Sequence, residues 1–155
     1  MIKGFVNEDI TDAYKLVTPG VAALIATKGG MEKLYDITPI AWIMPMDYEP
    51  VTKVIFSCDP AHQCDVNIKR TKEFAVCIPV DETDPLIEKC GSVSSADIDK
   101  FSRFGITGEK AAKTDLMIPV EMTAAWLECR LAKVIREGSV DLFIGECTAA
   151  FKKES

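Results

Sequence analysis

The chain has very little histidine and no surplus of positive charge. His62 is the single histidine among 155 residues, and the formal net charge is −6. One imidazole cannot build a metal site that needs several histidines, and an acidic chain argues against a nucleic-acid surface, which needs a basic face. No apolar run reaches the roughly 18–20 residues of a membrane-spanning helix, and the N-terminus lacks the pattern of a secretory signal. We therefore expect a cytoplasmic protein that has no metal, nucleic-acid or membrane partner.

Several common sequence motifs are also missing. The six cysteines form no C-x-x-C pair, which argues against a zinc site and against a thioredoxin-like redox motif. Neither G-x-G-x-x-G nor G-x-x-x-x-G-K-[ST] occurs in the chain, so a dinucleotide-binding fold and a P-loop are excluded as the main architecture. In a cytosolic protein the cysteines are expected to act mostly as small buried hydrophobic side chains.

The composition supports a substantial hydrophobic core. Apolar residues make up 48% of the chain and charged residues 27%, as in an ordinary soluble domain. The length is close to the commonest size of one domain. The sequence contains no internal repeat or low-complexity segment, so residues 1–155 are expected to form a single domain.

Short apolar runs separated by turn residues predict a mainly β protein. The apolar positions of residues 123–135 mostly alternate, which favours a strand over a helix, and Glu137-Gly138 then turns the chain. Lys28-Gly29-Gly30 predicts a hairpin turn in the same way. Because such strands follow one another as hairpins, and closure removes exposed sheet edges, we expect a closed or nearly closed antiparallel barrel. The five or six predicted strands fall within residues 21–27, 37–46, 51–58, 74–80, 123–135 and 140–151.

Capping residues predict two or three short helices between the strands. Asp59 and Pro60 suit the N-cap and the first position of a helix over residues 61–71. Asp84-Pro85 begins a second helix in the same way, and a third is expected over residues 95–104. Further expectations are a short helix or turn over residues 12–16 and a polar loop over residues 110–116.

Eight short segments occur in an order that resembles one protein family. Each segment is weak evidence alone, but their order on an antiparallel pattern is fairly specific. They are Pro19–Ala22, Thr38–Trp42, Glu49-Pro50, Asn67-Ile68 with Glu73-Phe74, Cys90–Ser92, Asp99–Phe101, Leu127–Cys129 and Leu142–Glu146. Over almost the whole chain this pattern is similar to the flavin reductase-like proteins, which include flavoredoxins and the small flavin reductases that supply monooxygenases.

The resemblance implies a fold, a cofactor and an activity. The fold would be an antiparallel split β-barrel with a few short helices, the FMN-binding split barrel. The protein would be a homodimer with the flavin at or near the subunit interface. Bound FMN would take electrons from NAD(P)H and pass them to a flavin, a metal or a redox partner protein. Because the flavin carries this chemistry and hydride transfer needs no side-chain acid or base, we expect binding residues and no catalytic residue.

The resemblance also indicates which residues would hold the flavin. Residues 38–44 of a barrel strand would supply an apolar bed and backbone groups for the flavin ring. The loop 57–64 runs into a helix N-terminus, where hydroxyl, imidazole, amide and backbone N–H groups suit a phosphate, and a lysine would add positive charge. The expected cofactor-binding residues are Thr38, Pro39, Ile40, Ala41, Trp42, Ser57, His62, Gln63, Cys64, Asn67 and Lys100.

Two alternatives remain open at the level of sequence. The same site would serve an electron-transfer flavoprotein without its own NAD(P)H reaction. The barrel would also serve as a binding or scaffold protein that has lost the flavin. Cys64 and the early end of the chain motivate this last alternative. The family commonly has threonine, often with a basic residue nearby, where this chain has Cys64 and the acidic Asp59, and a thiol is a poorer phosphate donor than a hydroxyl. We also expect the chain to lack the tail with which many relatives continue.

Overall fold

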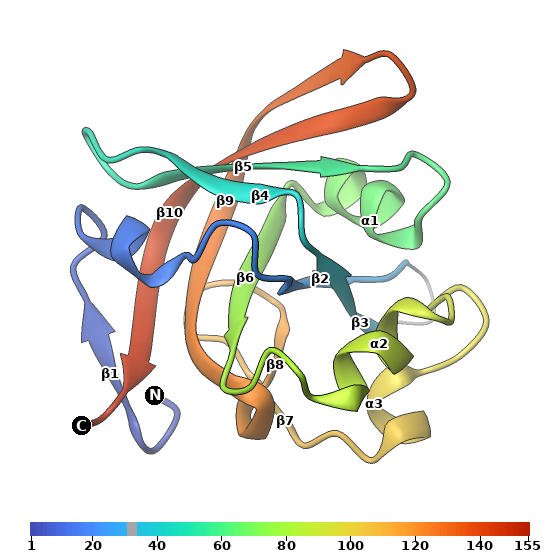
Figure 1. Ribbon diagram of the computed structural model, residues 1–155, viewed down its shortest axis with the longest axis horizontal. Helices are drawn as coiled ribbons and strands as arrows, with labels where there is room; N and C mark the ends of the chain where they lie inside the picture. The colour runs from blue at the N-terminus through green and yellow to red at the C-terminus, as the bar shows by residue number, and fades with distance from the viewer. Residues whose placement is uncertain (31–33) are drawn as a thin grey trace.

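The computed structural model describes residues 1–30 and 34–155, in which ten strands enclose most of the core (Figure 1). The elements, in chain order, are β1 (Phe5–Glu8), the 3-10 helix η1 (Ala13–Leu16), β2 (Ala23–Lys28), β3 (Tyr35–Ile40), β4 (Ile43–Asp47), β5 (Lys53–Cys58), α1 (Gln63–Thr71), β6 (Glu73–Pro79), α2 (Pro85–Gly91), α3 (Lys100–Phe104), β7 (Gly108–Lys110), β8 (Met117–Pro119), the 3-10 helix η2 (Val120–Met122), β9 (Thr123–Glu137) and β10 (Val140–Lys153).

One antiparallel sheet forms a nearly closed barrel. Its strand order is β3-β2-β6-β9-β10-β5-β4, with β1 paired to β10 beside this path. The two edge strands, β3 and β4, are consecutive in the chain and are joined only by Ala41 and Trp42. The opening of the barrel therefore lies where the chain passes from one sheet edge to the other, and the expectation of a nearly closed antiparallel barrel is confirmed.

This crossing corrects the prediction of one continuous strand over residues 37–46. The run divides into β3, which pairs with β2, and β4, which pairs with β5. Both halves are apolar, so periodicity alone gave no sign of the break. The backbone N–H of Ser57 donates to the carbonyl oxygen of Trp42 at 3.0 Å, and this bond fixes the crossing against β5.

The long hairpin of β9 and β10 is the centre of the sheet. Alternating burial along β10 places Phe143 inside the barrel, in one cluster with Phe56 and Phe74. The ring centroid of Phe56 is 5.4 Å from that of Phe143 and 5.1 Å from that of Phe74. Gly145 lies so close to the Phe74 ring that a Cβ atom there would collide with it. A second buried cluster around Trp126 fills the outer side of the sheet beneath β7 and β8.

The β7–β8 pair is a small two-stranded sheet that flanks the polar loop predicted over residues 110–116. The loop between these strands is tied to β9 by Glu128, whose buried carboxylate accepts the backbone N–H groups of Ala112, Lys113 and Thr114 at 2.7–2.9 Å. The strands β1, β7 and β8 have only three or four residues each. Such short strands are too brief to show a period of two in the sequence.

The helices confirm the predicted positions but not every predicted start. Asp84 accepts the N–H of Leu86 at 2.9 Å, so α2 begins as expected. Helix α1 begins at Gln63 instead of residue 61, because Asp59 caps a separate turn by accepting the N–H of Ala61 at 2.9 Å. Helix α3 begins at Lys100, five residues later than predicted, with Asp99 as its N-cap.

The predicted turn at Lys28-Gly29-Gly30 follows β2, and Lys28 pairs with Tyr35 in the antiparallel ladder. The chain therefore reverses here as expected. Within residues 1–30 and 34–155, no helix is long and apolar enough to cross a membrane.

Candidate functional site

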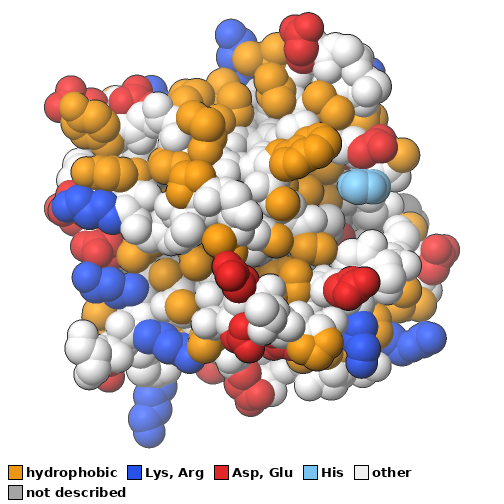
Figure 2. Space-filling model, in the orientation of Figure 1, with side chains coloured by type: hydrophobic (Ala, Val, Ile, Leu, Met, Phe, Trp, Pro, Cys, Tyr) orange, Lys and Arg blue, Asp and Glu red, His pale blue; other side chains and the backbone are white. Residues whose placement is uncertain are grey.

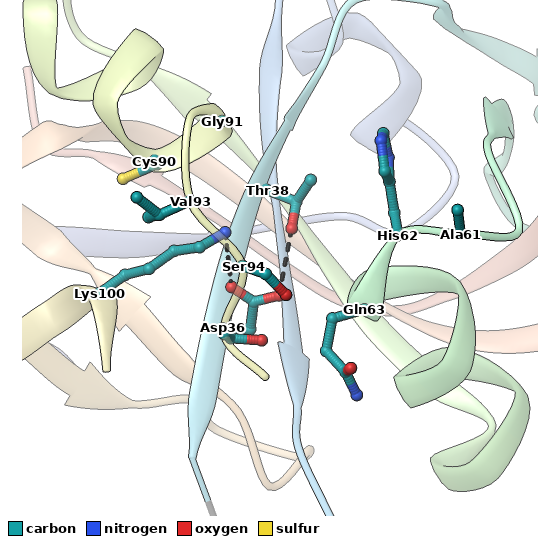
Figure 3. A pocket seen from close by; sticks show the side chains of 11 residues that line it. Asp36, Thr38, Ala61, His62, Gln63, Cys90, Gly91, Val93, Ser94 and Lys100 are labelled. Carbon is teal, nitrogen blue, oxygen red and sulfur yellow. Dashed lines mark hydrogen bonds and ion pairs between the residues drawn. The ribbon is translucent and has the colours of Figure 1, made fainter. Parts of the chain in front are cut away.

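Two neighbouring hollows lie where the chain crosses from β3 to β4. They share His62, which precedes α1. The larger hollow, of about 260 Å³, lies between the crossing, the end of β5 and the start of β10. Its lining residues are Pro39, Ile40, Ala41, Trp42, Ser57, Cys58, Asp59, His62 and Val140. The smaller, of about 100 Å³, extends towards α2 and α3 (Figure 3). Its lining residues are Asp36, Thr38, Ala61, His62, Gln63, Cys90, Gly91, Val93, Ser94, Ser95 and Lys100.

The larger hollow is built from an interrupted sheet edge. Edge strands leave part of their backbone N–H and C=O groups without a ladder partner, and Pro39 is tolerated in β3 because an edge strand does not need every N–H. Ala41 and Trp42 are both exposed, and Trp42 is 76% exposed. The hollow therefore combines apolar side chains with backbone polar groups, which suits a flat aromatic ligand with a polar edge.

The smaller hollow contains a buried ion pair between two elements. Lys100, the first residue of α3, places Nζ 2.8 Å from Asp36 Oδ1 of β3 and donates to the carbonyl oxygen of Ile37 at 2.8 Å. Thr38 Oγ1 donates to the other carboxylate oxygen of Asp36 at 3.2 Å (Figure 3). Asp36 and Lys100 are 1% and 2% exposed. Each charge is thus held in place by the other and by the sheet edge.

Two polar atoms of this hollow have no hydrogen-bond partner in the protein. The ammonium group of Lys100 lies at ion-pair distance from Asp36 Oδ1 but without hydrogen-bond geometry, so that oxygen accepts no hydrogen bond. The hydroxyl of Ser95, a residue only 4% exposed, is also without a partner. Buried polar groups of this kind are rare and costly in folded proteins. Both atoms belong to residues that line the hollow, and Asp36 Oδ1 is compensated by the ammonium group of Lys100 at 2.8 Å.

The start of α1 offers donors beside both hollows. His62 occupies the N-cap position and is exposed, but its side chain makes no capping hydrogen bond. The first N–H groups of a helix have no partner within the helix, so this end can hold an anion. Gln63 lines the smaller hollow and donates from Nε2 to Asn67 Oδ1 at 2.9 Å. Asn67 in turn donates from Nδ2 to Thr27 Oγ1 of β2 at 3.0 Å. This bond fixes the Asn67 amide, which in turn orients the Gln63 side chain.

A charged network fixes α1 against the β9–β10 hairpin. Lys69 Nζ lies 2.8 Å from Asp65 Oδ1 and 2.6 Å from Asp141 Oδ2, and Arg136 Nε donates to Asp141 Oδ1 at 2.7 Å. The guanidinium of Arg136 holds the pKa of Asp141 well below its usual range. Burial, followed by the neighbouring Asp141, raises the pKa of Asp65. Asp141 follows Val140 directly, so the network also positions one wall of the larger hollow.

The structure brings most of the expected site residues together. Thr38, His62, Gln63 and Lys100 line the smaller hollow, and the larger is lined by Pro39, Ile40, Ala41, Trp42, Ser57 and again His62. Cys64 and Asn67 are completely buried and line neither hollow. Contact with the Cys58 thiol, together with burial, raises the pKa of Cys64 well above its usual value.

Sequence reasoning missed Asp36, Ser95 and Val140. The signal for Asp36 was available, because a carboxylate inside the apolar run Tyr35–Ile40 must find a partner when the strand is buried. Neither Ser95 nor Val140 carries a comparable local signal, since each reaches its hollow only through the packing of distant elements.

The comparisons with known proteins agree with this geometry. The family model described as a flavin reductase like domain matches residues 16–155. YddH of Escherichia coli K12, an uncharacterized protein, is 28% identical over 147 residues, which cover 94% of this chain and 77% of YddH. The FMN-binding domain of a flavin reductases-like enzyme from Shewanella baltica OS155 superposes with a TM-score of 0.79 at 23% identity, covering 96% of this chain and 77% of that one.

The flavoredoxin of Desulfovibrio vulgaris (Miyazaki F) shares the fold as well. It superposes with a TM-score of 0.76 at 20% identity, covering 90% of this chain and 72% of that one. The mainly antiparallel barrel with a few short helices is thus the fold of FMN-binding split-barrel structures. Because the family model covers most of the sequence, the chain belongs to the flavin reductase-like family.

Proposed function

We propose that this protein binds FMN across the two hollows and acts as an NAD(P)H-dependent oxidoreductase of the flavin reductase type. The observation that carries the proposal is that the two hollows adjoin at His62 along the barrel opening. Apolar side chains, polar atoms without a hydrogen-bond partner and a helix N-terminus thus lie next to one another. Taken together, the hollows are near the lower end of the roughly 300–1,000 Å³ of small-molecule sites. In this proposal residues 1–155 form one flavin-binding domain.

The residues present fit the separate parts of FMN. The apolar part of the flavin ring would lie in the larger hollow against Pro39, Ile40, Ala41 and Trp42. Backbone N–H and C=O groups of the sheet edge would bind the polar groups of the ring. The loop from Ser57 to the start of α1 would hold the phosphate through a hydroxyl and free N–H groups, as helix N-termini do. Cys64 would contribute backbone there and not its thiol, because its side chain is buried in the core.

When bound, the flavin would supply hydride acceptance and electron release. The contribution of this chain is then to bind the ring, orient one of its faces and keep water from the other. His62 is exposed at the junction of the hollows. We assign it to binding, because hydride transfer to a flavin requires no proton donor at that position.

An exposed apolar strip beside the larger hollow supports the proposal of a homodimer with the flavin near the interface. Trp42, Met44, Met46 and Tyr48 are all exposed and occupy every second position along β4 and its ends. Figure 2 shows hydrophobic side chains gathered on the upper part of the molecule, over β4 and β5. Contiguous exposed apolar patches of this kind mark interaction surfaces. Sedimentation velocity would test the dimer, and a monomer at micromolar concentration would contradict it.

The first experiment is a visible absorption spectrum of the purified protein after gel filtration, with and without added FMN. A flavin band that elutes with the protein supports the proposal, and no band even after reconstitution rejects it. The variant Ala41→Asp places a charge on the apolar bed and should lose the band without a change in Tm, because Ala41 is exposed. Ala132→Asp, at an exposed position on β9, is the matched control.

The same exposed strip favours a second candidate, an electron carrier that is reduced by a partner protein. Trp42 lines the larger hollow and is also exposed on the strip, so a docked protein would lie next to the flavin. Anaerobic mixing of the FMN-loaded protein with NADH and with NADPH separates the two candidates. Bleaching of the flavin supports the reductase, whereas a stable oxidised spectrum with both donors leaves the carrier.

A further inference from the structure

Helix α1 and the β9–β10 hairpin meet at two buried carboxyl groups. The side chains of Asp65 in α1 and Asp141 in β10 are only 2% and 3% exposed. Lys69 Nζ lies 2.8 Å from Asp65 Oδ1 and 2.6 Å from Asp141 Oδ2, so one ammonium group contacts both acids. The two carboxyl groups are also close enough to hydrogen-bond to each other. Neighbouring buried carboxylates repel each other, and one of them then binds a proton more readily than a lone acid does.

The two acids have unequal sets of partners. Asp141 accepts from Arg136 Nε at 2.7 Å and from Lys69 Nζ at 2.6 Å, so both of its oxygens are satisfied. Asp65 Oδ1 faces the same ammonium group. Asp65 Oδ2, by contrast, is buried and has no hydrogen-bond partner among the residues that the structure describes. An ionised oxygen there lacks a donor, whereas a protonated carboxyl group has an O–H to donate. Asp65 is therefore the acid that gains from a proton, and Asp141 is its acceptor.

The charged groups that face Asp65 come from three elements: Lys69 of α1, Asp141 of β10 and Arg136 of β9. His62 lies just before α1, and its backbone carbonyl accepts the Asp65 N–H at 3.1 Å, but its side chain is exposed. The side chains of Lys69 and Arg136 are 40% and 55% exposed. Water screens these two cations more than it screens the buried acids, so they offset the repulsion between the acids only in part.

From this geometry we infer that Asp65 and Asp141 hold one proton between them, donated by Asp65, and that this proton is a pH-sensitive link between α1 and the β9–β10 hairpin. The inference does not depend on the proposed flavin chemistry. Burial and the neighbouring Asp141 raise the pKa of Asp65, in agreement with it. A carboxyl group whose pKa is raised by folding adds stability that is complete below its unfolded-state pKa of roughly 3.9. That stability is lost as the pH rises through the folded-state pKa, so the link weakens from mildly acid to alkaline pH.

The link joins two elements that border the larger hollow. Helix α1 begins directly after His62, and Asp141 follows Val140 in β10; both His62 and Val140 line that hollow. Loss of the proton therefore loosens two walls of the barrel opening together.

Asp65→Asn is the sharpest test, because asparagine keeps the shape of the side chain and its NH₂ group donates permanently to Asp141. Relative to the wild type, the variant should gain stability as the pH rises from 4 to 8, and its Tm at pH 8 should equal or exceed that of the wild type. If Asp65 were simply an ionised partner of Lys69, its removal would lower the Tm at pH 8. That result overturns the inference.

Asp141→Asn is the matched control, since it makes the same chemical change on the other side of the link. It removes a charged acceptor from Arg136 and Lys69 and should lower the Tm at pH 8 by roughly 5 °C or more. Thermal unfolding followed by circular dichroism measures both variants. Equal losses of Tm in the two variants would contradict the assignment of the proton to Asp65.

Carboxyl ¹³C NMR of the wild-type protein detects the proton itself, whether or not the variants fold. The Asp65 carboxyl signal, assigned through its backbone neighbours, should titrate clearly above the ordinary aspartate value of roughly 3.9. Lys69→Met removes the shared cation and should move this titration to still higher pH, whereas Lys72→Met, at an exposed position just after α1, should leave it in place. An Asp65 signal that titrates at or below the ordinary value overturns the inference.

Amide hydrogen exchange tests the effect on α1. Protection factors in α1, corrected for the intrinsic pH dependence of exchange, should fall between pH 5 and pH 8 in the wild type and stay constant in Asp65→Asn. The same fall in both proteins would show that the proton does not hold α1 in place, and it would overturn the proposed link.

Discussion

Replacing Glu128 by glutamine is expected to destabilise the protein much more than a single polar substitution usually does. The Glu128 side chain is completely buried in β9. Its Oε1 accepts from the N–H groups of Lys113 and Thr114 and from Thr114 Oγ1, and its Oε2 accepts from the N–H of Ala112 and from Trp126 Nε1 at 3.1 Å. The carboxylate is thus the common acceptor that holds the loop between β7 and β8 on the sheet.

The magnitude follows from the two oxygens. Glutamine keeps one carbonyl oxygen, but its NH₂ group would face the donors of Ala112 and Trp126, so two hydrogen bonds to a charged group are lost. Such bonds contribute about 1.5–3 kcal/mol each. Part of this loss is recovered because Ala112 is exposed and its N–H can turn to water. We therefore expect the free energy of unfolding to fall by about 3 kcal/mol, which corresponds to a Tm lower by roughly 6–12 °C for a domain of this size.

Urea unfolding followed by tryptophan fluorescence measures this effect directly, since Trp126 is itself one of the donors. Amide hydrogen exchange should show faster exchange at residues 112–114 before the rest of the sheet is affected. Glu146→Gln is the control, because Glu146 makes one exposed ion pair with Arg130 and should change stability by less than about 1 kcal/mol. A Glu128→Gln variant within about 0.5 kcal/mol of wild type would refute the reasoning.

Three further predictions concern other parts of the fold. The Arg136 guanidinium lowers the pKa of Asp141. The stability that this pair contributes is therefore complete above the unfolded-state pKa of roughly 3.9 and is lost as the pH falls further. Asp141→Asn should make the free energy of unfolding fall less steeply with acid in urea titrations from pH 5 to pH 2. Gly145→Ala should cost about 1–3 kcal/mol in the same assay, since the new Cβ meets the Phe74 ring; an unchanged midpoint would show that the ring moves freely. Trp42→Ala should leave stability within about 0.5 kcal/mol but weaken FMN retention on gel filtration, and unaltered retention would remove Trp42 from the site.

The sequence predicts the long elements of this fold well, because their signals are local. Alternation over residues 123–135 indicates β9, and Asp84 before Pro85 indicates the start of α2, and both are confirmed. The division of residues 37–46 into β3 and β4 was not predictable in this way. It depends on which strands lie beside each half, and that information is spread over β2 and β5.

The candidate site was likewise predictable only where its residues are neighbours in the sequence. The run from Thr38 to Trp42 is contiguous, so a resemblance over five residues could single it out, and the structure has all five beside the hollows. The partner of Lys100 is 64 positions away in β3, and nothing near either residue indicates the pairing. Cys64 illustrates the opposite case, since a position two residues into a helix faces either the site or the core, and only the packing of α1 decides that it faces the core.

The position of β10 in the sheet sets the order in which the barrel is completed during synthesis. β1 and β5 both pair with β10, and the ladder joins Phe5 to Lys153 and Ser57 to Leu142. While residues 140–153 remain in the ribosome, β1 has no strand beside it and one side of β5 is open. Contacts so distant in sequence slow folding, and unpaired strand edges favour association between nascent chains. Chaperone contact during translation should therefore persist until residues 140–153 have emerged from the ribosome.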